Sequence, residues 1–317
     1  MPKAKILVTR KLPDDVENRL IDTFETILNP SDEIYSAEKL IQQSKNVDAI
    51  LCAPGDQIGA DLITQLPDRI GIISTFSVGY EHIDISAAHA RGIAVTNTPG
   101  VLTDATADIA LLLLLGAARR AYEGERMIRE DKWTGWTPTQ LMGIGLQGKR
   151  LGLLGMGRIG QAVADRAKAF GMEVHYHNRN KTDYDALYHE TAEGLLQVSD
   201  FLSLHFPLTP ETHHFLSAEK MALLPKGAVV INTARGPVIK DDDLIAALKS
   251  GQVAAAGLDV FEGEPDLHSD YRDLTNTFLL PHLGSATRET RNAMGFCAID
   301  NLVAFFNNER PPNLVKV

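Results

Sequence analysis

The sequence is poor in cysteine and has no long apolar run. Among 317 residues only Cys52 and Cys297 are cysteines, and no CxxC pair or Cys/His ligand spacing occurs. A disulfide framework is therefore not expected, and a buried thiol is the simplest interpretation of each cysteine. The longest apolar run, 109–118, is followed by two arginines and, at about ten residues, is too short to cross a bilayer. We interpret it as a buried helix.

An excess of positive charge is also missing. Lys and Arg total 31 against 41 for Asp and Glu, which gives a formal net charge of −10, and no block of basic residues stands out. This balance argues against a nucleic-acid partner. The first residues run directly into a strand-like segment without the apolar region of a signal peptide. We therefore expect a cytoplasmic protein with neither a nucleic-acid nor a membrane partner.

Several catalytic motifs are absent. No HExxH and no Cys/His cluster occurs, so no metal site is predicted. The absence of GxSxG argues against a serine hydrolase. Two histidine pairs, His175 with His177 and His213 with His214, are interpreted as structural or solvated.

Short strand-like runs alternate with helical stretches along the chain. In the first third we predict strands at 5–9, 49–53, 70–75 and 93–98, and helices at 13–22, 36–44, 59–65 and 83–90. The pattern then restarts, with strands at 150–155, 172–177, 201–206, 228–234, 254–260 and 277–282, and helices at 158–169, 217–224 and 241–250. Such alternation predicts parallel sheets with helices on both faces. The fold class is thus α/β, with two Rossmann-like, doubly wound domains and a cleft between them.

Two further segments, about 103–130 and 287–307, have the composition of long helices. Thr103 or Asp104 is a candidate cap for the first helix, and Ser285 or Thr287 for the second.

A glycine-rich turn carries the first functional signal. Residues 155–160 read Gly155-Met156-Gly157-Arg158-Ile159-Gly160, between a predicted strand and an amphipathic helix. A lone GxGxxG is weak evidence, but this context is that of a dinucleotide-binding unit. The first glycine allows the tight turn, the second lets the backbone approach a pyrophosphate, and the third lets the helix pack on the strand. The alternative is a purely structural turn.

The end of the next strand indicates which dinucleotide is preferred. NAD-binding sites usually place an acidic residue there, but the segment 175–181 has none. Asn178 can hydrogen-bond a 2′-phosphate, and Arg179 can pair with it through two N–H groups. We therefore expect NADPH as the cofactor, with weaker use of NADH. The alternative is that Arg179 lies on a solvated loop and selects little.

Three polar residues follow the last predicted strands, where ligands collect in open parallel sheets. The guanidinium of Arg235 can bind a carboxylate through two parallel N–H groups. His282 is a candidate general acid that would protonate a developing alkoxide. Glu264, against the far imidazole nitrogen, would fix the tautomer and favour the charged form. Each residue taken alone also has an ordinary interpretation. Arg235 could be a surface charge, Glu264 a turn residue before proline, and His282 a core or loop histidine with structural hydrogen bonds.

Besides the glycine turn, the chain contains several specific motifs in a fixed order: 77–84 (SVGYEHID), 101–108 (VLTDATAD), 232–236 (NTARG), 259–261 (DVF) with Glu264-Pro265, and 281–285 (PHLGS). Through these motifs, nearly the whole chain resembles the D-isomer-specific 2-hydroxyacid dehydrogenase family.

The resemblance implies that Arg235, Glu264 and His282 are the catalytic set and that backbone N–H groups of Val78 and Gly79 hold the substrate carboxylate. It implies that Asp259 contacts the nicotinamide carboxamide. Further residues would line the cofactor site: Thr106, Pro207, Thr212, Thr233, Ala234 and Gly284. It also implies a flavodoxin-like substrate-binding domain at 1–98 plus 288–317 and a dinucleotide-binding Rossmann domain at 99–287.

Within the family, the chain is most similar to glyoxylate/hydroxypyruvate reductases. Three features carry this similarity: the absence of an acidic residue in 175–181, the 101–108 motif and the segment 133–136. Such enzymes are dimers, so a homodimer is expected. Trp136 either packs at the dimer interface or closes the partner's substrate pocket.

The expected reaction is NADPH-dependent reduction of a small 2-keto acid. Two other functions remain open: a D-3-phosphoglycerate or other D-2-hydroxyacid dehydrogenase, and a dinucleotide-sensing binding protein of the corepressor kind. The absence of interaction tails argues against the sensor. The missing acid and the lack of an added regulatory domain argue against the phosphoglycerate enzyme. A formate dehydrogenase is disfavoured because Glu264 stands where that group would carry an amide.

Overall fold

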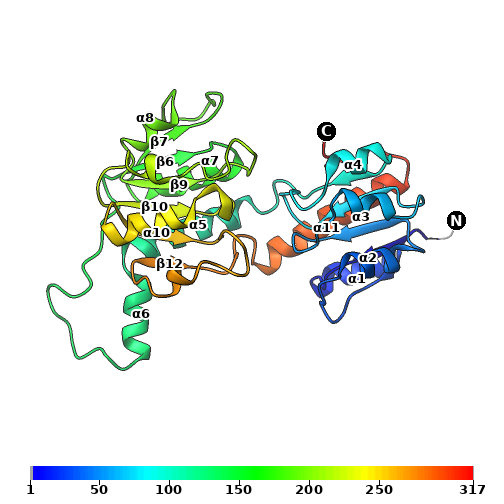
Figure 1. Cartoon of the computed structure of the whole chain (residues 1–317), viewed down its shortest axis with the longest axis horizontal. Helices are drawn as coiled ribbons and strands as arrows, with labels where there is room; N and C mark the ends of the chain where they lie inside the picture. Colours follow the sequence, from blue (N-terminus) through cyan, green and yellow to red (C-terminus); the bar gives the residue numbers. More distant parts are fainter. Residues whose placement is uncertain (1–2, 317) are drawn as a thin grey trace. The chain divides into compact units, whose positions relative to one another are not determined.

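The computed structural model describes residues 3–316, and the chain divides into two compact units (Figure 1). The first consists of the described residues up to Leu102 and those from Ala286 onward, and the second is Thr103–Ser285. These boundaries differ by a few residues from the domain boundaries expected from the sequence, which lie between 98 and 99 and between 287 and 288. Among the described residues, no helix is both long and apolar enough to span a membrane.

The first unit contains a five-stranded parallel sheet in the order β2-β1-β3-β4-β5. Its strands are β1 (Lys5–Val8), β2 (Glu25–Ile27), β3 (Ala49–Cys52), β4 (Ile72–Thr75) and β5 (Ala94–Thr96). This is the flavodoxin-like order. One face is covered by α1 (Asp14–Thr23) and α11 (Arg288–Phe306), and the other by α2 (Ala37–Ser44), α3 (Ala60–Gln65) and α4 (Ile85–Ala90). The first unit is discontinuous in sequence because α11 follows the second unit.

The second unit contains a seven-stranded parallel sheet in the order β12-β11-β10-β9-β6-β7-β8. Its strands are β6 (Arg150–Leu154), β7 (Glu173–His177), β8 (Leu187–Tyr188), β9 (Phe201–Leu204), β10 (Ala228–Asn232), β11 (Val253–Leu258) and β12 (Thr277–Leu279). The order reverses between β6 and β9, which is the Rossmann switch point where ligands bind.

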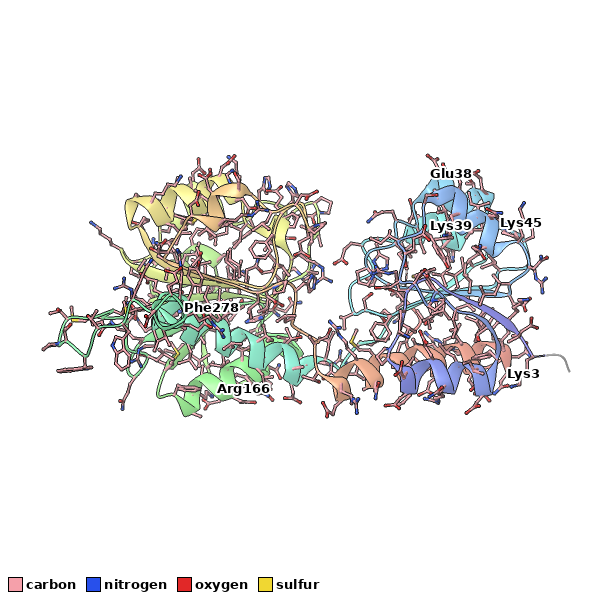
Figure 2. The ribbon with its side chains drawn as sticks, turned by 90° about the horizontal axis from the view of Figure 1, so that it is seen from below. Lys3, Glu38, Lys39, Lys45, Arg166 and Phe278 are labelled. Atoms are coloured by element: carbon pink, nitrogen blue, oxygen red, sulfur yellow. The ribbon has the colours of Figure 1, made fainter. Side chains whose placement is uncertain are left out.

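Helices cover both faces of this second sheet. On one face lie α5 (Thr103–Ala118) and α7 (Arg158–Ala169), and on the other α8 (Ala192–Leu196), α9 (Ala218–Met221) and α10 (Asp241–Ser250). Gly116 allows α5 to lie directly against Phe278 (Figure 2), since a Cβ at this position would come within 2.4 Å of the ring. The predicted α/β class with two doubly wound sheets is confirmed.

The prediction of one continuous helix at 103–130 is wrong. The helix ends at Ala118, and α6 (Ala121–Arg129) begins after Arg120, whose φ of 55° is left-handed. The Ala118 carbonyl accepts from Ile144 N at 2.8 Å, so a residue distant in sequence takes the place of the next helical turn. The sequence also gave no signal for β2, β8 or α8, which are short. α6 and the segment that follows it project from the sheet of their unit (Figure 1), and the chain returns to the end of α5 where Ile144 N contacts the Ala118 carbonyl.

The predicted cap of the C-terminal helix is confirmed for one of its two candidates. Thr287 Oγ1 accepts from Thr290 N at 3.1 Å at the start of α11.

Candidate active site

The carboxyl edge of the second sheet gathers most of the predicted site residues. Along the strand order, the residues that follow each strand are His282 and Gly284 after β12, Asp259 and Glu264 after β11, Thr233 to Arg235 after β10, Pro207 and Thr212 after β9, Gly155 to Gly160 after β6, and Asn178 and Arg179 after β7. The charged groups expected to act on a substrate thus lie on one side of the switch point. Those expected to bind a 2′-phosphate lie on the other.

The three glycines of the turn after β6 are required for three different reasons. Gly155 has a φ of 98°, and a Cβ there would lie 2.5 Å from the His205 carbonyl oxygen. A Cβ at Gly160 would lie 2.2 Å from the Gly155 oxygen, so α7 can pack on the turn only without a side chain. At Gly157 a Cβ would meet no protein atom within 4 Å. Such open space is expected at the second glycine of the motif, where a pyrophosphate approaches the backbone.

The beginning of α7 adds favourable electrostatics to this open space. The helix begins after Gly157 with no side-chain cap, so backbone N–H groups of its first turn are left to point outward. Uncapped N–H groups together with the positive end of the helix dipole attract an anion. The turn therefore fits the pyrophosphate of a dinucleotide. The bound group would supply or accept a hydride at its nicotinamide ring.

His205 lies at the same sheet edge as the glycine turn, although no motif in the sequence singled it out. It follows β9, which pairs with the glycine-motif strand, and its Nε2 lies 2.8 Å from Ser203 Oγ. Its Nδ1 lies 3.4 Å from Thr233 Oγ1. Burial lowers the pKa of His205 to about 4, so the imidazole is neutral near pH 7. Its position directly after a buried strand, two residues before Pro207, was the available signal.

The loop after β9 is held by one threonine. Thr212 Oγ1 donates to the Pro207 carbonyl at 2.8 Å and accepts from Thr209 N at 2.7 Å. These bonds fix the segment that the resemblance placed beside the cofactor.

The segment after β7 presents polar and basic groups. Asn178 donates through Nδ2 to the Asn180 carbonyl at 3.1 Å, and Arg179 is exposed. Arg179 interacts electrostatically with Glu211, which is also exposed, on the loop after β9. No acidic residue lies in 175–182.

His282 and Glu264 form a hydrogen-bonded pair. His282 Nδ1 lies 2.8 Å from Glu264 Oε2, and Glu264 Oε1 accepts from Phe261 N at 2.7 Å. Burial alone would raise the pKa of Glu264. The hydrogen bond and charge of His282, with the Phe261 N–H and the charge of Arg235, outweigh it and lower that pKa. With Nδ1 held by a carboxylate, Nε2 is the nitrogen left to face a ligand.

A buried carboxylate fixes the loop that carries this histidine. Asp259 is 1% exposed, and its two oxygens accept from Leu283 N at 2.6 Å and Gly284 N at 2.8 Å. His282 N donates to the Asp259 carbonyl at 2.9 Å, and His282 has a left-handed φ of 56°. Burial raises the pKa of Asp259, and the two backbone N–H groups offset part of this rise. In this structure Asp259 therefore positions the histidine loop.

The turn after β10 places Arg235 close enough to Glu264 for its charge to act on that carboxylate. Asn232 Oδ1 accepts from Ala234 N, and its Nδ2 donates to the Arg235 carbonyl, both at 2.9 Å. A Cβ on Gly236 would lie 1.9 Å from the Phe261 carbonyl, so only glycine allows this turn to touch the loop that bears Glu264. Asn232 and Gly236 belong to a motif recognised in the sequence, but their positioning roles emerge only from these contacts.

In the first unit, Val78 and Gly79 lie in a loop after β4. The Val78 carbonyl accepts from Asn97 Nδ2 at 2.7 Å, and the Gly79 carbonyl accepts from Ser77 Oγ at 2.6 Å. Both carbonyls are thus held by side chains of their own unit. Within residues 3–316 we find no hydrogen-bond acceptor for the N–H group of either residue.

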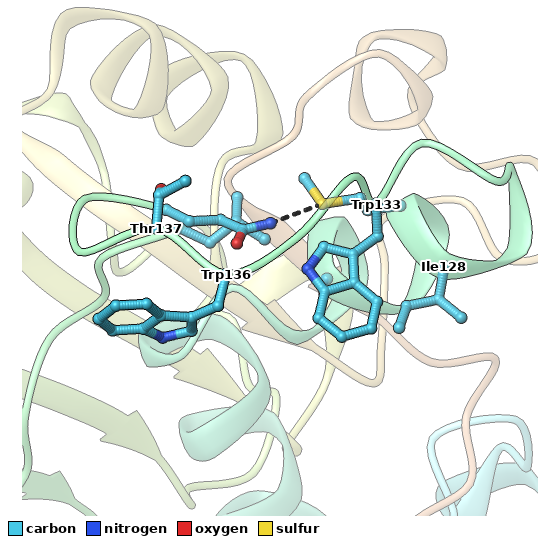
Figure 3. Close-up of a pocket in the computed structure, with 8 residues that line it drawn as sticks. Ile128, Trp133, Trp136 and Thr137 are labelled. Atoms are coloured by element: carbon cyan, nitrogen blue, oxygen red, sulfur yellow. Dashed lines mark hydrogen bonds between the residues drawn. The ribbon is translucent and has the colours of Figure 1, made fainter.

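Trp136 lies in the segment that follows α6 and is 80% exposed. It lines a shallow pocket with Trp133 and Ile128, and both indole rings lie on the same side of the segment (Figure 3). Met127 and Gln140 also line this pocket, and Gln140 Nε2 lies 3.0 Å from Met127 Sδ. The exposed fractions of Trp133 and Ile128 are 54% and 62%, which is unusual for such side chains.

A switch-point glycine turn followed by polar groups at the next strand ends is the arrangement of a dinucleotide-dependent oxidoreductase. The family model described as "D-isomer specific 2-hydroxyacid dehydrogenase, NAD binding domain" matches residues 111–284. A glycerate dehydrogenase of Hyphomicrobium methylovorum is 44% identical over 96% of this chain and 97% of its own. A glyoxylate reductase of Thermococcus litoralis is 43% identical over 99% and 97%.

Among solved structures, the NADPH-dependent glyoxylate/hydroxypyruvate reductase of Sinorhizobium meliloti, in complex with NADP and malonate, superimposes with a TM-score of 0.90. The two chains are 36% identical, with 99% of this chain and 97% of that chain covered. The chain belongs to the D-isomer specific 2-hydroxyacid dehydrogenase family and is an oxidoreductase.

We expect Gly157→Ala to lower the affinity for NADP⁺ at least about tenfold, because the methyl group would occupy the space through which a pyrophosphate approaches the backbone. The melting temperature should stay unchanged, since no protein atom lies within 4 Å of that Cβ. Fluorescence titration and thermal unfolding measure the two effects. Gly160→Ala is the matched control: its Cβ would overlap the Gly155 oxygen, so it should destabilise the fold by about 1–3 kcal/mol. Unchanged affinity in Gly157→Ala would contradict this assignment.

Proposed function

We propose that the enzyme reduces a small 2-keto acid with NADPH, converting glyoxylate to glycolate and hydroxypyruvate to D-glycerate. The observation that carries the proposal is the hydrogen-bonded His282–Glu264 pair, with Arg235 beside it, on the same sheet edge as the glycine turn. The relatives named glyoxylate reductase and glycerate dehydrogenase support this substrate class. In the balanced reaction, keto acid, NADPH and one proton give hydroxy acid and NADP⁺.

Substrate orientation is assigned to Arg235 and to the Val78–Gly79 backbone. A 2-keto acid presents a carboxylate next to its carbonyl, and the planar guanidinium of Arg235 matches a carboxylate in a two-point contact. The N–H groups of Val78 and Gly79, for which we find no acceptor within residues 3–316, suit a carboxylate as well. Holding the carboxylate fixes the direction in which the carbonyl carbon is presented.

Protonation of the new hydroxyl group is assigned to His282. As the carbonyl carbon is reduced, negative charge grows on its oxygen, and a positioned imidazolium stabilises this charge and then donates its proton. Glu264 on Nδ1 keeps Nε2 as the donor nitrogen. The backbone bonds from the His282 loop to Asp259 hold the ring in place.

The preference for NADPH is assigned to Asn178 and Arg179. No carboxylate in 175–182 repels a 2′-phosphate, and the exposed guanidinium of Arg179 is able to pair with it. The relative from Sinorhizobium meliloti that is described as NADPH-dependent supports this assignment. Thr106, Thr233 and Ala234, all buried at the same edge, complete the proposed cofactor site.

We infer a homodimer in which Trp136 closes the substrate pocket of the partner. The support is the extended segment after α6, whose large apolar side chains are exposed in the single chain. Exposed aromatic side chains gathered around one pocket are typical of protein interfaces.

We expect fast oxidation of NADPH with glyoxylate and hydroxypyruvate, and slow oxidation with pyruvate and phenylpyruvate. In His282→Ala, turnover should fall about 10²–10⁴-fold because the proton donor is lost, whereas NADPH binding should be nearly unchanged. Initial rates and a fluorescence titration measure the two quantities. Equal loss of both would defeat the general-acid assignment. Tight NADPH binding by the wild type without turnover of any of the four acids would instead favour another substrate or a sensing role.

Arg179→Ala should weaken NADPH binding by about 1–3 kcal/mol and leave NADH binding almost unchanged, because only NADPH carries the phosphate that the guanidinium pairs with. Binding titrations of both cofactors give the ratio. Arg310→Ala, at an exposed arginine of the first unit, is the control for a general charge effect. If the ratio does not change in Arg179→Ala, the charge argument for NADPH fails.

For Trp136→Ala, we expect KM for the keto acid to rise at least about tenfold while sedimentation still gives the mass of a dimer, because the indole would leave the partner's pocket open. Phe170→Ala removes an exposed aromatic side chain elsewhere in the second unit and should alter neither quantity. A monomeric wild type, or a variant that loses dimerisation without any effect on KM, would refute this role.

A further inference from the structure

Two adjacent histidines and one glutamate form a cluster separate from the His282–Glu264 pair. His213 and His214 lie in the loop after β9, and Glu262 lies in the loop after β11. One possible ligand atom from each side chain lies within 4.8 Å of those of the other two. No motif spacing in the sequence indicated this cluster, because Glu262 is brought in by the fold.

The backbone around the histidines explains why both rings reach the same place. Adjacent side chains on an extended chain point in opposite directions. Here His214 has a left-handed φ of 51°, and the two ring centroids are only 3.9 Å apart. The backbone N–H of His213 donates to Thr209 O at 3.0 Å, and that of His214 donates to Pro237 O at 2.7 Å. The loop backbone is therefore held in a conformation that brings both imidazoles to the same side.

Glu262 completes the set with an oxygen ligand. Its Oε1 lies 2.8 Å from His214 Nε2, and both side chains are partly exposed. Neighbouring acids add negative potential, since Asp241 interacts electrostatically with Glu262, and Asp243 with His214. Lys240, 3.3 Å from Asp243, offsets part of that potential.

The geometry points to a binding site for one divalent transition-metal ion, such as Zn²⁺ or Co²⁺, held by His213, His214 and Glu262. Two imidazoles and one carboxylate favour such ions over Mg²⁺ and Ca²⁺, which prefer sets of oxygen ligands. Around a tetrahedral ion with bonds of about 2.1 Å, ligand atoms lie about 3.4 Å apart. That spacing falls between the 2.8 Å contact and the 4.8 Å limit of this cluster, so small side-chain rotations suffice.

A bound ion would join two loops of the second unit. One loop contains Thr212, and the other continues from Glu262 to Glu264. Binding to the folded chain alone would stabilise it by mass action, so the site is detectable without any assay of turnover. The metal test therefore stands independently of the proposed reaction.

The experiment uses the full-length protein without an affinity tag, freed of metal by a chelator and dialysis. Titration with Co²⁺, followed by its visible absorption, and with Zn²⁺, followed by calorimetry, should show one equivalent per chain with Kd on the order of 1 µM. Zn²⁺ should also raise the melting temperature. The absence of saturable binding would overturn the proposal.

Three variants separate ligation from other effects. His213→Gln removes one ligand and should weaken binding about 100-fold. Glu262→Gln keeps a hydrogen-bond acceptor for His214 but loses the charge. It should therefore melt like the wild type without metal and lose most of the stabilisation by Zn²⁺. His89→Gln, at an exposed histidine of α4, should bind like the wild type. Unchanged binding in His213→Gln would show that the cluster is only a structural ion pair and would reject the site.

Discussion

The parallel pairing of seven strands is the constraint on which the candidate site depends. Parallel strands end at a common edge, so residues that follow β6, β9, β10, β11 and β12 lie along one edge although long helices and loops separate them in sequence. The reversal of order between β6 and β9 leaves room at this edge for a ligand. A change in strand order would separate Arg235 from Glu264 or from the glycine turn, even with every local motif intact.

The second requirement is that other atoms can come close to the backbone. At some glycines these atoms belong to the protein, and at another the space is open for a ligand. At Gly155, Gly160 and Gly236 a Cβ would overlap neighbouring backbone, so these positions let segments of the protein touch. At Gly157 the space beside the backbone is open, which suits a ligand. The contacts that a Cβ would make therefore separate the glycines needed for packing from the one beside open space, in agreement with the roles that the motif positions predict.

The chemistry proposed for His282 depends on two carboxylates with different environments. Glu264 touches the imidazole directly, and the charges around it lower its pKa, so it remains an anion beside the ring. Asp259 is buried, and both of its oxygens accept backbone N–H groups from the histidine loop. One carboxylate thus bonds a ring nitrogen, and the other holds the loop that carries the ring. This division suits the proposed proton donor, which must be held rigidly.

The sequence by itself determined the α/β class, the strand and helix that flank the glycine turn, and the residue types at the strand ends, because alternating apolar runs and turn residues are local signals. It missed β2 and β8, which are too short to show a period, and it missed the helix break at Arg120, which depends on Ile144. Only the tertiary structure decided the strand order, the contact of Gly236 with Phe261 and the meeting of His214 with Glu262. Each of these depends on segments distant in sequence, whose contacts are fixed by packing and by sheet register rather than by local preference.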